Sequence, residues 1–357
     1  MISGDAVDSF TVDFTPTESI VRGKHYPLGH FAAEALAMPF GRSADIDRAF
    51  ATFQEDIQMF FAARTPSSVG VAYQSVRRLW EELRKLPVYS VLLEGDTSVN
   101  YLLPYMRDHP EEVDDMMTEG TERNESYSRW IGKLRSLSDE LRSFDRNTKW
   151  MLEEFFNDLP SRRKDAYALA FGRFSQTISE AIQYEEDTGE SAGSVIDLKS
   201  VRFEHPVSVS FSTQRNKETG MLELTEKLSF ESLPSFLYVD LFKGIAAGNL
   251  PRRCAHCRRW FLAVGGYNTM YCDRAVEGKN GKTCRDIGAH EKEKAKQKSG
   301  AGKIYSRTYN RLKARKRYGT LSTDEWNRMV AVAQDIRDAY QAKQITLQEY
   351  EGKMNAL

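Results

Sequence analysis

Four cysteines are the residues in this sequence whose type and spacing point most clearly to chemistry. They are Cys254, Cys257, Cys272 and Cys284, and all of them fall in one short window. A Cys-x2-Cys pair offers two thiolates to one soft metal ion, and two further thiolates complete a tetrahedral set. The bridges of a secreted disulfide scaffold would be spread along the chain instead. The spacing therefore predicts one zinc site.

Four thiolates fill the coordination sphere of zinc and leave no position for water or substrate, so the predicted site is structural. The apo protein should lose the surrounding module, because structural zinc in small finger peptides binds with roughly 10 to 16 kcal/mol near neutral pH. Two histidines are alternative ligands, His256 within the first cysteine pair and His290 after Cys284. A different interpretation is that the cysteines pack in a core, or that Cys254 and Cys257 form a redox pair.

Aromatic residues flank the cysteines and indicate a small core beside the metal. Trp260 and Phe261 follow the first pair, and Tyr271 precedes Cys272. The residues from Cys284 onward are typical of the first turn of a helix, which would place the last ligand at a helix N-terminus. A knuckle, a hairpin and a ligand-bearing helix together predict a treble clef.

This region resembles two groups of treble-clef proteins at the motifs CAHCRRWF, YCD and TCRDIGA. One is an uncharacterised bacterial and phage-borne family with a matching four-cysteine pattern, and the other is the CGNR zinc fingers. The resemblance covers about residues 230–318 and implies a zinc module, with DNA binding as the role that the CGNR fingers imply. Those fingers space their last two cysteines closely and continue with Gly-Asn-Arg. Here eleven residues separate Cys272 from Cys284, and Arg-Asp-Ile-Gly follows.

Charge is distributed unevenly along the chain. The segment Pro251–Tyr318 holds 19 Lys and Arg against 5 Asp and Glu, a net charge of +14, whereas the rest of the chain carries −15. The sequence therefore predicts an acidic body joined to a basic module. One basic stripe recurs every four residues along a predicted helix, at Lys303, Arg307, Arg311 and Arg315. Like charges at this spacing repel each other on a helix.

An uncompensated basic stripe suggests a polyanionic partner, and a phosphate backbone is the first candidate. We expect non-specific or weakly specific binding of DNA or RNA through Arg285, Arg307, Arg311, Arg315, Lys316 and Arg317, and the family resemblance implies a regulatory role for it. The alternative is that the basic helix docks on the acidic body, or that the chain is an interaction or scaffold protein with a purely structural zinc site. The acidic body would then be a surface for a protein partner.

No sequence motif predicts an enzyme. The sequence contains no phosphate-binding glycine loop, nucleophile elbow or metalloprotease helix, and its acidic pairs are typical of solvated helix faces. A metal-dependent nuclease is the minority alternative, with His290 and Asn310 as the available residues, but no motif places them together. We therefore expect no catalytic residue and no cofactor other than zinc.

The elements that position these residues are predicted to be mainly helical. We expect four parts: an acidic helical body at 1–195, a β-hairpin with a helix at 196–250, the zinc module at 251–300, and a basic helix with a helical tail at 301–357. Residues 1–42 should be irregular, because Pro and Gly interrupt any period. Ser43 is a candidate N-cap for the first long helix, and separate helices are predicted at 126–143 and 145–157.

The chain contains no run of about 18 apolar residues, and its N-terminus lacks the basic and apolar regions of a signal peptide. We therefore expect a cytoplasmic protein without a membrane partner. Two capping boxes, Ser322 with Glu325 and Thr346 with Glu349, predict the starts of the last two helices.

Overall fold

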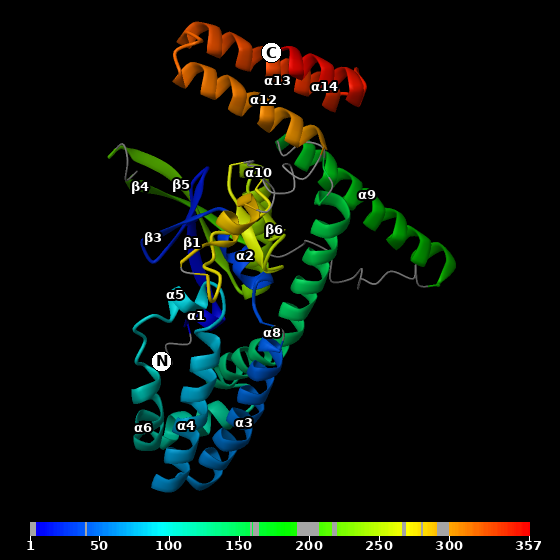
Figure 1. Cartoon of the computed structure of the whole chain (residues 1–357). Coiled ribbons are helices and arrows are strands. Elements are labelled where there is room, and N and C mark those ends of the chain that lie inside the picture. Colours follow the sequence, from blue (N-terminus) through cyan, green and yellow to red (C-terminus); the bar gives the residue numbers. More distant parts are fainter. Residues whose placement is uncertain are drawn as a thin grey trace. The chain divides into compact units, whose positions relative to one another are not determined.

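The computed structural model describes residues 5–39, 41–157, 159, 164–190, 207–215, 220–265, 269–279, 281–290 and 300–357 (Figure 1). Over these residues the protein is mainly α, which confirms the predicted fold class. The chain divides into two compact units. The first unit consists of Met1–Cys254 and Arg258–Met270, and the second consists of Ala255–Cys257 and Tyr271–Leu357.

The first unit contains an antiparallel sheet with the strand order β3-β2-β1-β5-β4. Its strands are β1 (Phe10–Phe14), β2 (Glu18–Val21), β3 (Lys24–Pro27), β4 (Ser208–Arg215) and β5 (Leu222–Phe230). The expectation of an irregular N-terminal segment is therefore wrong. The interrupting residues lie in turns and at strand ends: Gly23 has a positive φ of 74° between β2 and β3, and Pro27 ends β3.

The pairing of β1 with β5 places the predicted β-hairpin and the N-terminal strands in one sheet. Phe10 pairs with Phe230 and Val12 with Leu228, and all four side chains are buried on one face. Phe236 of α10 (Leu233–Ala247) packs on this face, with its ring centroid 5.5 Å from that of Phe10 and 5.3 Å from that of Phe230. The core of the first unit therefore includes the layer between the sheet and α10. The domain boundaries drawn from the sequence stay a prediction.

Helix α2 (His30–Leu36) packs closely against α10. A Cβ atom on Gly244 of α10 would lie only 2.8 Å from the Cα atom of Gly29, just before α2. One turn earlier in α10, the carboxylate of Asp240 accepts hydrogen bonds of 3.0 Å from the backbone N–H groups of Gly29 and Ala32. The start of α2 is thus held by a glycine contact and a buried carboxylate.

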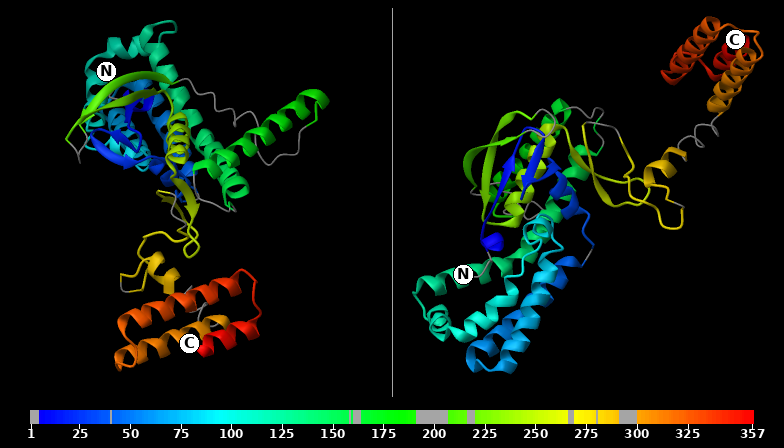
Figure 2. Two further views of the ribbon diagram at one scale, coloured as in Figure 1. Left: turned by 90° about the horizontal axis from the view of Figure 1, so that it is seen from above. Right: turned by 90° about the vertical axis from the view of Figure 1, so that its left-hand side faces the viewer.

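The other helices of the first unit are α1 (Asp5–Asp8), α3 (Arg42–Ala63), α4 (Pro66–Leu83), α5 (Tyr89–Leu92), α6 (Val99–Asp108), α7 (Pro110–Met117), α8 (Glu122–Met151), the π-helical turn η1 (Leu152–Phe156) and α9 (Lys164–Thr188). Helices α3 and α4 lie side by side (Figure 2).

Two predictions about these helices are corrected. The N-cap of α3 is Gly41, with φ of 100°, and not Ser43. The helices predicted at 126–143 and 145–157 are one helix that continues through α8 into η1, because the residues around Phe144 include no Gly or Pro.

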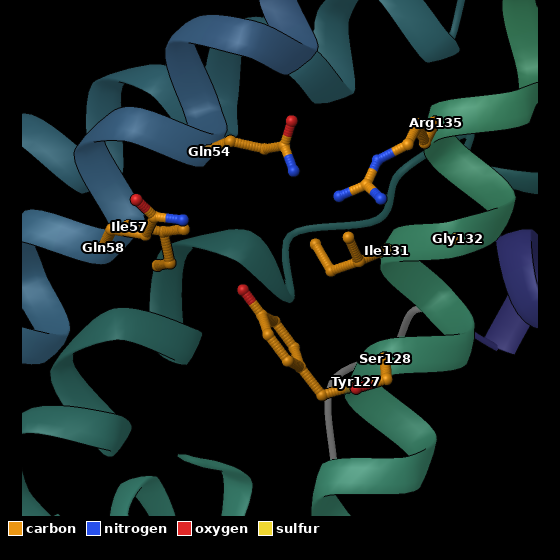
Figure 3. Close-up of a pocket in the computed structure, with 8 residues that line it drawn as sticks. All are labelled: Gln54, Ile57, Gln58, Tyr127, Ser128, Ile131, Gly132 and Arg135. Atoms are coloured by element: carbon orange, nitrogen blue, oxygen red, sulfur yellow. The ribbon is translucent and has the colours of Figure 1, made fainter.

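A shallow groove of about 260 Å³ lies between α3 and α8 (Figure 3). It is lined by Gln54, Ile57, Gln58, Tyr127, Ser128, Ile131, Gly132 and Arg135. The side chains of Gln54 and Arg135 extend toward each other (Figure 3), and burial raises the pKa of Tyr127 to about 12. The lining combines amides, apolar groups and one guanidinium, without a nucleophile beside a base.

The second unit ends in three helices, α12 (Gly300–Arg317), α13 (Thr323–Gln341) and α14 (Leu347–Ala356). They enclose a small core of Ile304, Ala333, Tyr350 and Met354. Both predicted capping boxes are confirmed at the starts of α13 and α14. Of the helices in the described residues, none has the length and apolar character needed to span a membrane.

Candidate metal centre

The first cysteine pair lies in a tight turn between two short strands. Strand β6 (Leu250–Arg253) pairs antiparallel with β7 (Trp260–Ala263), and Cys254 follows β6 directly. The Cys254 N–H donates to the Arg259 carbonyl, and the Arg258 N–H donates to the Cys254 carbonyl, both at 2.9 Å. Arg258 has a positive φ of 62°, as a reversal this tight requires. These contacts form the predicted knuckle.

The second pair is held by a further set of backbone hydrogen bonds. The Cys284 N–H donates to the Arg274 carbonyl at 2.9 Å, and the Arg285 N–H donates to the Cys272 carbonyl at 3.0 Å. Residues 284–290 are helical. Cys284 therefore lies at a helix N-terminus, as the sequence predicts.

This helix begins with reciprocal hydrogen bonds of the capping-box type. The Asp286 N–H donates to the Thr283 hydroxyl at 3.2 Å, and the Asp286 carboxylate accepts from the Thr283 N–H at 2.9 Å. These hydrogen bonds hold the pKa of Asp286 below its ordinary value. The cap fixes the direction of the chain at the residue just before Cys284.

The four sulfur atoms lie within 4.8 Å of one another and form a cluster that can hold a metal ion. Cys254, Cys272 and Cys284 are at most 2% exposed, and Cys257 is half-buried. The Cys257 and Cys272 sulfurs are 3.7 Å apart. This is far beyond a disulfide bond and close to the edge of about 3.8 Å of a tetrahedron with zinc–sulfur bonds of 2.3 Å. The cluster contains neither His256 nor His290, the two alternative ligands.

The aromatic residues near the cysteines serve packing. Trp260 is 5% exposed and belongs to the main core of the first unit, with the Arg253 guanidinium 5.6 Å from its ring. The Tyr271 ring lies so close to Gly288 that a Cβ at 288 would be 2.2 Å from a ring carbon. Gly288 was not singled out from the sequence as part of the site. The Gly-Ala pair after Cys284 was the available signal, because glycine within a helix often marks a close contact.

Four of the six residues proposed to contact nucleic acid already have partners inside the protein. Arg285 forms an ion pair of 2.8 Å with Asp273. Arg311 donates to the carbonyls of Met354 at 2.9 Å and Asn355 at 3.2 Å in α14, and Arg315 donates to the Leu357 carbonyl at 2.8 Å; Lys316 lies 4.3 Å from the Trp326 ring. Arg311 therefore satisfies two of the last carbonyls of α14, which have no partner within their own helix, and Arg315 holds the residue that follows the helix.

The other two, Arg307 and Arg317, are exposed and have no ion-pair or hydrogen-bond partner among the described residues. Lys303 and Lys313 have the same status. Residues four apart rotate by about 40° around a helix, so three steps carry the predicted stripe by about 120°. The stripe consequently winds from the solvent face at Lys303 to the α14 face at Arg315. At about 100° per residue, Lys303, Arg307, Lys313 and Arg317 fall within about 120° of one another on the exposed side of α12, and we call this set the free basic face.

Comparisons with known proteins agree with part of the resemblance drawn from the motifs. No curated protein and no solved structure matches the chain. The resemblance to the CGNR fingers stays a prediction. Residues 202–356 match a family described as "Family of unknown function (DUF6076)", so the similarity covers the β-hairpin, the cysteine cluster and the three C-terminal helices.

Proposed function

We propose that the four-cysteine cluster binds one structural zinc ion, and that the free basic face of α12 binds the phosphate backbone of DNA or RNA. The tetrahedral spacing of buried thiolates supports zinc, because soft sulfur ligands favour it over oxygen-seeking ions. Four thiolates fill the coordination sphere of the ion, so the site stabilises the surrounding fold and leaves no open position for a catalytic water or a substrate. The role of the metal is therefore to shape the module.

The free basic face is the observation that supports nucleic-acid binding. Helix α12 has seven Lys and Arg and no Asp or Glu, as its sequence GAGKIYSRTYNRLKARKR shows. The four residues of the free basic face are not neutralised within the described part of the protein. Exposed cations on one helix face can contact several phosphates of one backbone, and such contacts bind by releasing counterions. The proposed contact set is therefore Lys303, Arg307, Lys313 and Arg317.

A second function, protein interaction through a zinc-held scaffold, is favoured by the internal use of the other cations. Arg311 donates to the end of α14, Arg315 donates to Leu357 just after it, and Arg285 pairs with Asp273. These contacts show that the basic composition of the region is partly explained by its own folding. Nucleic-acid binding must therefore be tested at the free residues alone.

The test is a fluorescence anisotropy titration of the zinc-loaded full chain with short duplex DNA and single-stranded RNA at several salt concentrations. Replacing Arg307 and Arg317 together with Gln should weaken binding about tenfold or more at low salt. It should also reduce the slope of log affinity against log salt by about 2, since each lost phosphate contact removes about one unit. The matched control replaces Arg328 and Lys353, two exposed cations on α13 and α14, with Gln and carries the same change in net charge.

Equal losses in the two double variants would show that only net charge matters and would remove the free basic face from the proposal. No binding by the wild-type protein at low salt would overturn nucleic-acid binding and favour the scaffold function. The Arg311→Gln and Arg315→Gln pair separates folding from binding. It should lower the melting temperature of the three-helix unit, because the carbonyls at the end of α14 and of Leu357 just after it lose charged donors.

A further inference from the structure

The apolar face of the sheet continues beyond the core onto an exposed part of the β4–β5 hairpin. Register places Val209 and Phe211 of β4 on the same face as Leu224 and Leu228 of β5. Leu228 is 5% exposed, but Val209, Phe211 and Leu224 are 58%, 67% and 69% exposed. Leu222, further along this face, is 65% exposed. Large apolar side chains gathered in this way mark a binding surface more often than a solvated one.

The opposite face of the hairpin is polar and firmly tied to the rest of the sheet. The Ser212 hydroxyl and the Gln214 amide donate to the Asp13 carboxylate at 3.1 and 3.2 Å, and Ser212 also lies 2.7 Å from the Thr225 hydroxyl. These bonds link three neighbouring strands. The exposed apolar face is therefore presented by an ordered hairpin.

The two edges of the sheet differ in their protection against pairing. Edge strand β3 has four residues, of which Lys24 forms an ion pair with Glu94 and Pro27 lacks an N–H donor. Short length, lysine and proline are the usual devices that prevent an edge from pairing with another chain. Edge strand β4 has eight residues with the sequence SVSFSTQR, free of Pro, Lys and acidic groups. Its only charge, Arg215, folds back onto the Gly220 carbonyl at 2.6 Å.

We propose that β4 pairs antiparallel with β4 of a second copy of this chain, across a two-fold axis at Phe211. A two-fold axis perpendicular to the sheet keeps the apolar faces of the two copies on the same side of the joined sheet. Opposed residues of an antiparallel pair point to the same side, so each β4 residue must lie opposite a residue of the same face in the second copy. Phe211 then lies opposite Phe211 of the second copy, Val209 opposite Thr213, and Ser210 opposite Ser212. The Arg215 side chains fall at opposite ends of the ladder, opposite Val207.

This register explains why a second copy fits better than a charged strand. It places no like charges opposite each other, satisfies the outer N–H and C=O groups of β4, and brings two aromatic rings together across the strands. The two exposed faces join across the seam. In each copy the β5 residue opposite Phe211 is Glu226, whose carboxylate is paired with Lys243 at 2.5 Å, and Leu224 and Leu228 lie diagonally to either side of it. The proposal does not depend on the metal cluster or on the free basic face.

The experiment measures the molar mass of the zinc-loaded full chain by sedimentation over a range of concentrations. The wild-type protein should be dimeric at high concentration. Phe211→Lys should raise the dissociation constant at least about tenfold, because two ammonium groups would oppose each other across adjacent strands. Leu224→Lys is the matched control: it introduces the same charge at an equally exposed position of the same face, one strand away from the edge, and should have a smaller effect.

A cysteine variant tests the register itself. Phe211→Cys should form an intermolecular disulfide on mild oxidation, because opposed residues in an antiparallel pair have Cα atoms about 4.5 to 5.5 Å apart. Thr213→Cys, which faces Val209 of the second copy, should cross-link much less. A monomer at every concentration would overturn the proposal, and so would a dimer that Phe211→Lys leaves intact or one in which Thr213→Cys cross-links better than Phe211→Cys.

Discussion

At the residue scale, Asp240 of α10 is a fully buried carboxyl group whose protonation is shifted by its burial. Its side chain has no solvent exposure and accepts hydrogen bonds from the backbone N–H groups of Gly29 and Ala32. Burial raises the pKa of Asp240 to about 6, although these hydrogen bonds and the nearby His30 act to lower it. A carboxyl group that is protonated more easily in the folded protein than in the unfolded chain makes stability depend on pH.

The direction of this dependence follows from the two pKa values. The ordinary pKa of Asp is 3.8, and the folded value is about 6. The stabilisation from protonating Asp240 is therefore fully present below pH 3.8 and is lost as the pH rises through 6. From pH 4.5 to pH 7 the free energy of unfolding should lose about 2 kcal/mol from this group.

Asp240→Asn removes this titration and leaves the other groups, including His30, in place. We expect the difference in free energy of unfolding between wild type and variant to change by about 2 kcal/mol between pH 4.5 and pH 7, with the wild type relatively more stable at the lower pH. Urea titrations followed by tryptophan fluorescence at four pH values in this range would measure it. A constant difference would show that Asp240 does not change protonation in this window.

The cysteines show which residues of the site could be predicted from the sequence. Cys254 and Cys257 are brought together by a local turn, and the capping box at Thr283 is local as well. Such features depend on neighbouring residues only and are visible in the sequence. The partners of Arg311 and Arg315 lie 43 and 42 residues further along the chain. The two arginines act as donors because tertiary packing brings the end of the chain next to α12. Their four-residue spacing does not reveal these partners, and by itself it predicts a ligand-binding stripe.

At the element scale, the N-terminal strands illustrate the same limit for the fold. Strand β1 pairs with β5, and Phe10 lies opposite Phe230, more than two hundred residues away. Strands β2 and β3 have only four residues each. Such short strands between Gly and Pro show little periodicity, so their tertiary partners decide their structure. The long helices and the capped starts of α13 and α14 were predictable because their apolar period and caps are local.

The packing of α2 on α10 gives a prediction in which helix propensity and tertiary contact oppose each other. Gly244→Ala would favour the helical backbone of α10 by about 1 kcal/mol. The added Cβ, however, would lie 2.8 Å from the Gly29 Cα and 3.0 Å from the Leu28 carbonyl oxygen, both of them backbone atoms. We expect the clash to dominate and the variant to be less stable by about 1 to 3 kcal/mol.

Gly172→Ala in α9 is the matched control for this substitution. A Cβ at Gly172 meets no atom within 4 Å, so only the propensity gain should remain, and stability should rise by up to about 1 kcal/mol. The two variants should therefore change the urea midpoint in opposite directions. A stabilised Gly244→Ala protein would contradict the close approach of α10 to the start of α2.

At the scale of the whole molecule, the cysteine cluster is separate from both hydrophobic cores. Neither the core around Phe236 and Phe10 nor the core around Tyr350 and Met354 includes a cysteine. The backbone near the cluster is instead held by turns and a few hydrogen bonds. A bound metal would therefore supply much of the local stability, as in small zinc modules whose folding depends on the ion.

Metal removal should consequently unfold the protein locally. After chelation, hydrogen exchange should accelerate at residues 254–259 and 271–290, while β1, α10 and α12 to α14 keep most of their protection, because each of those parts retains its own buried core. Native mass spectrometry should find one zinc ion per chain before chelation. Cys272→Ser should reproduce the chelated pattern, whereas His256→Ala and His290→Ala should retain zinc, since neither histidine belongs to the cluster. Loss of zinc in either histidine variant would replace the four-cysteine site with a mixed one, and unchanged exchange after chelation would show that the turns hold their shape without the ion.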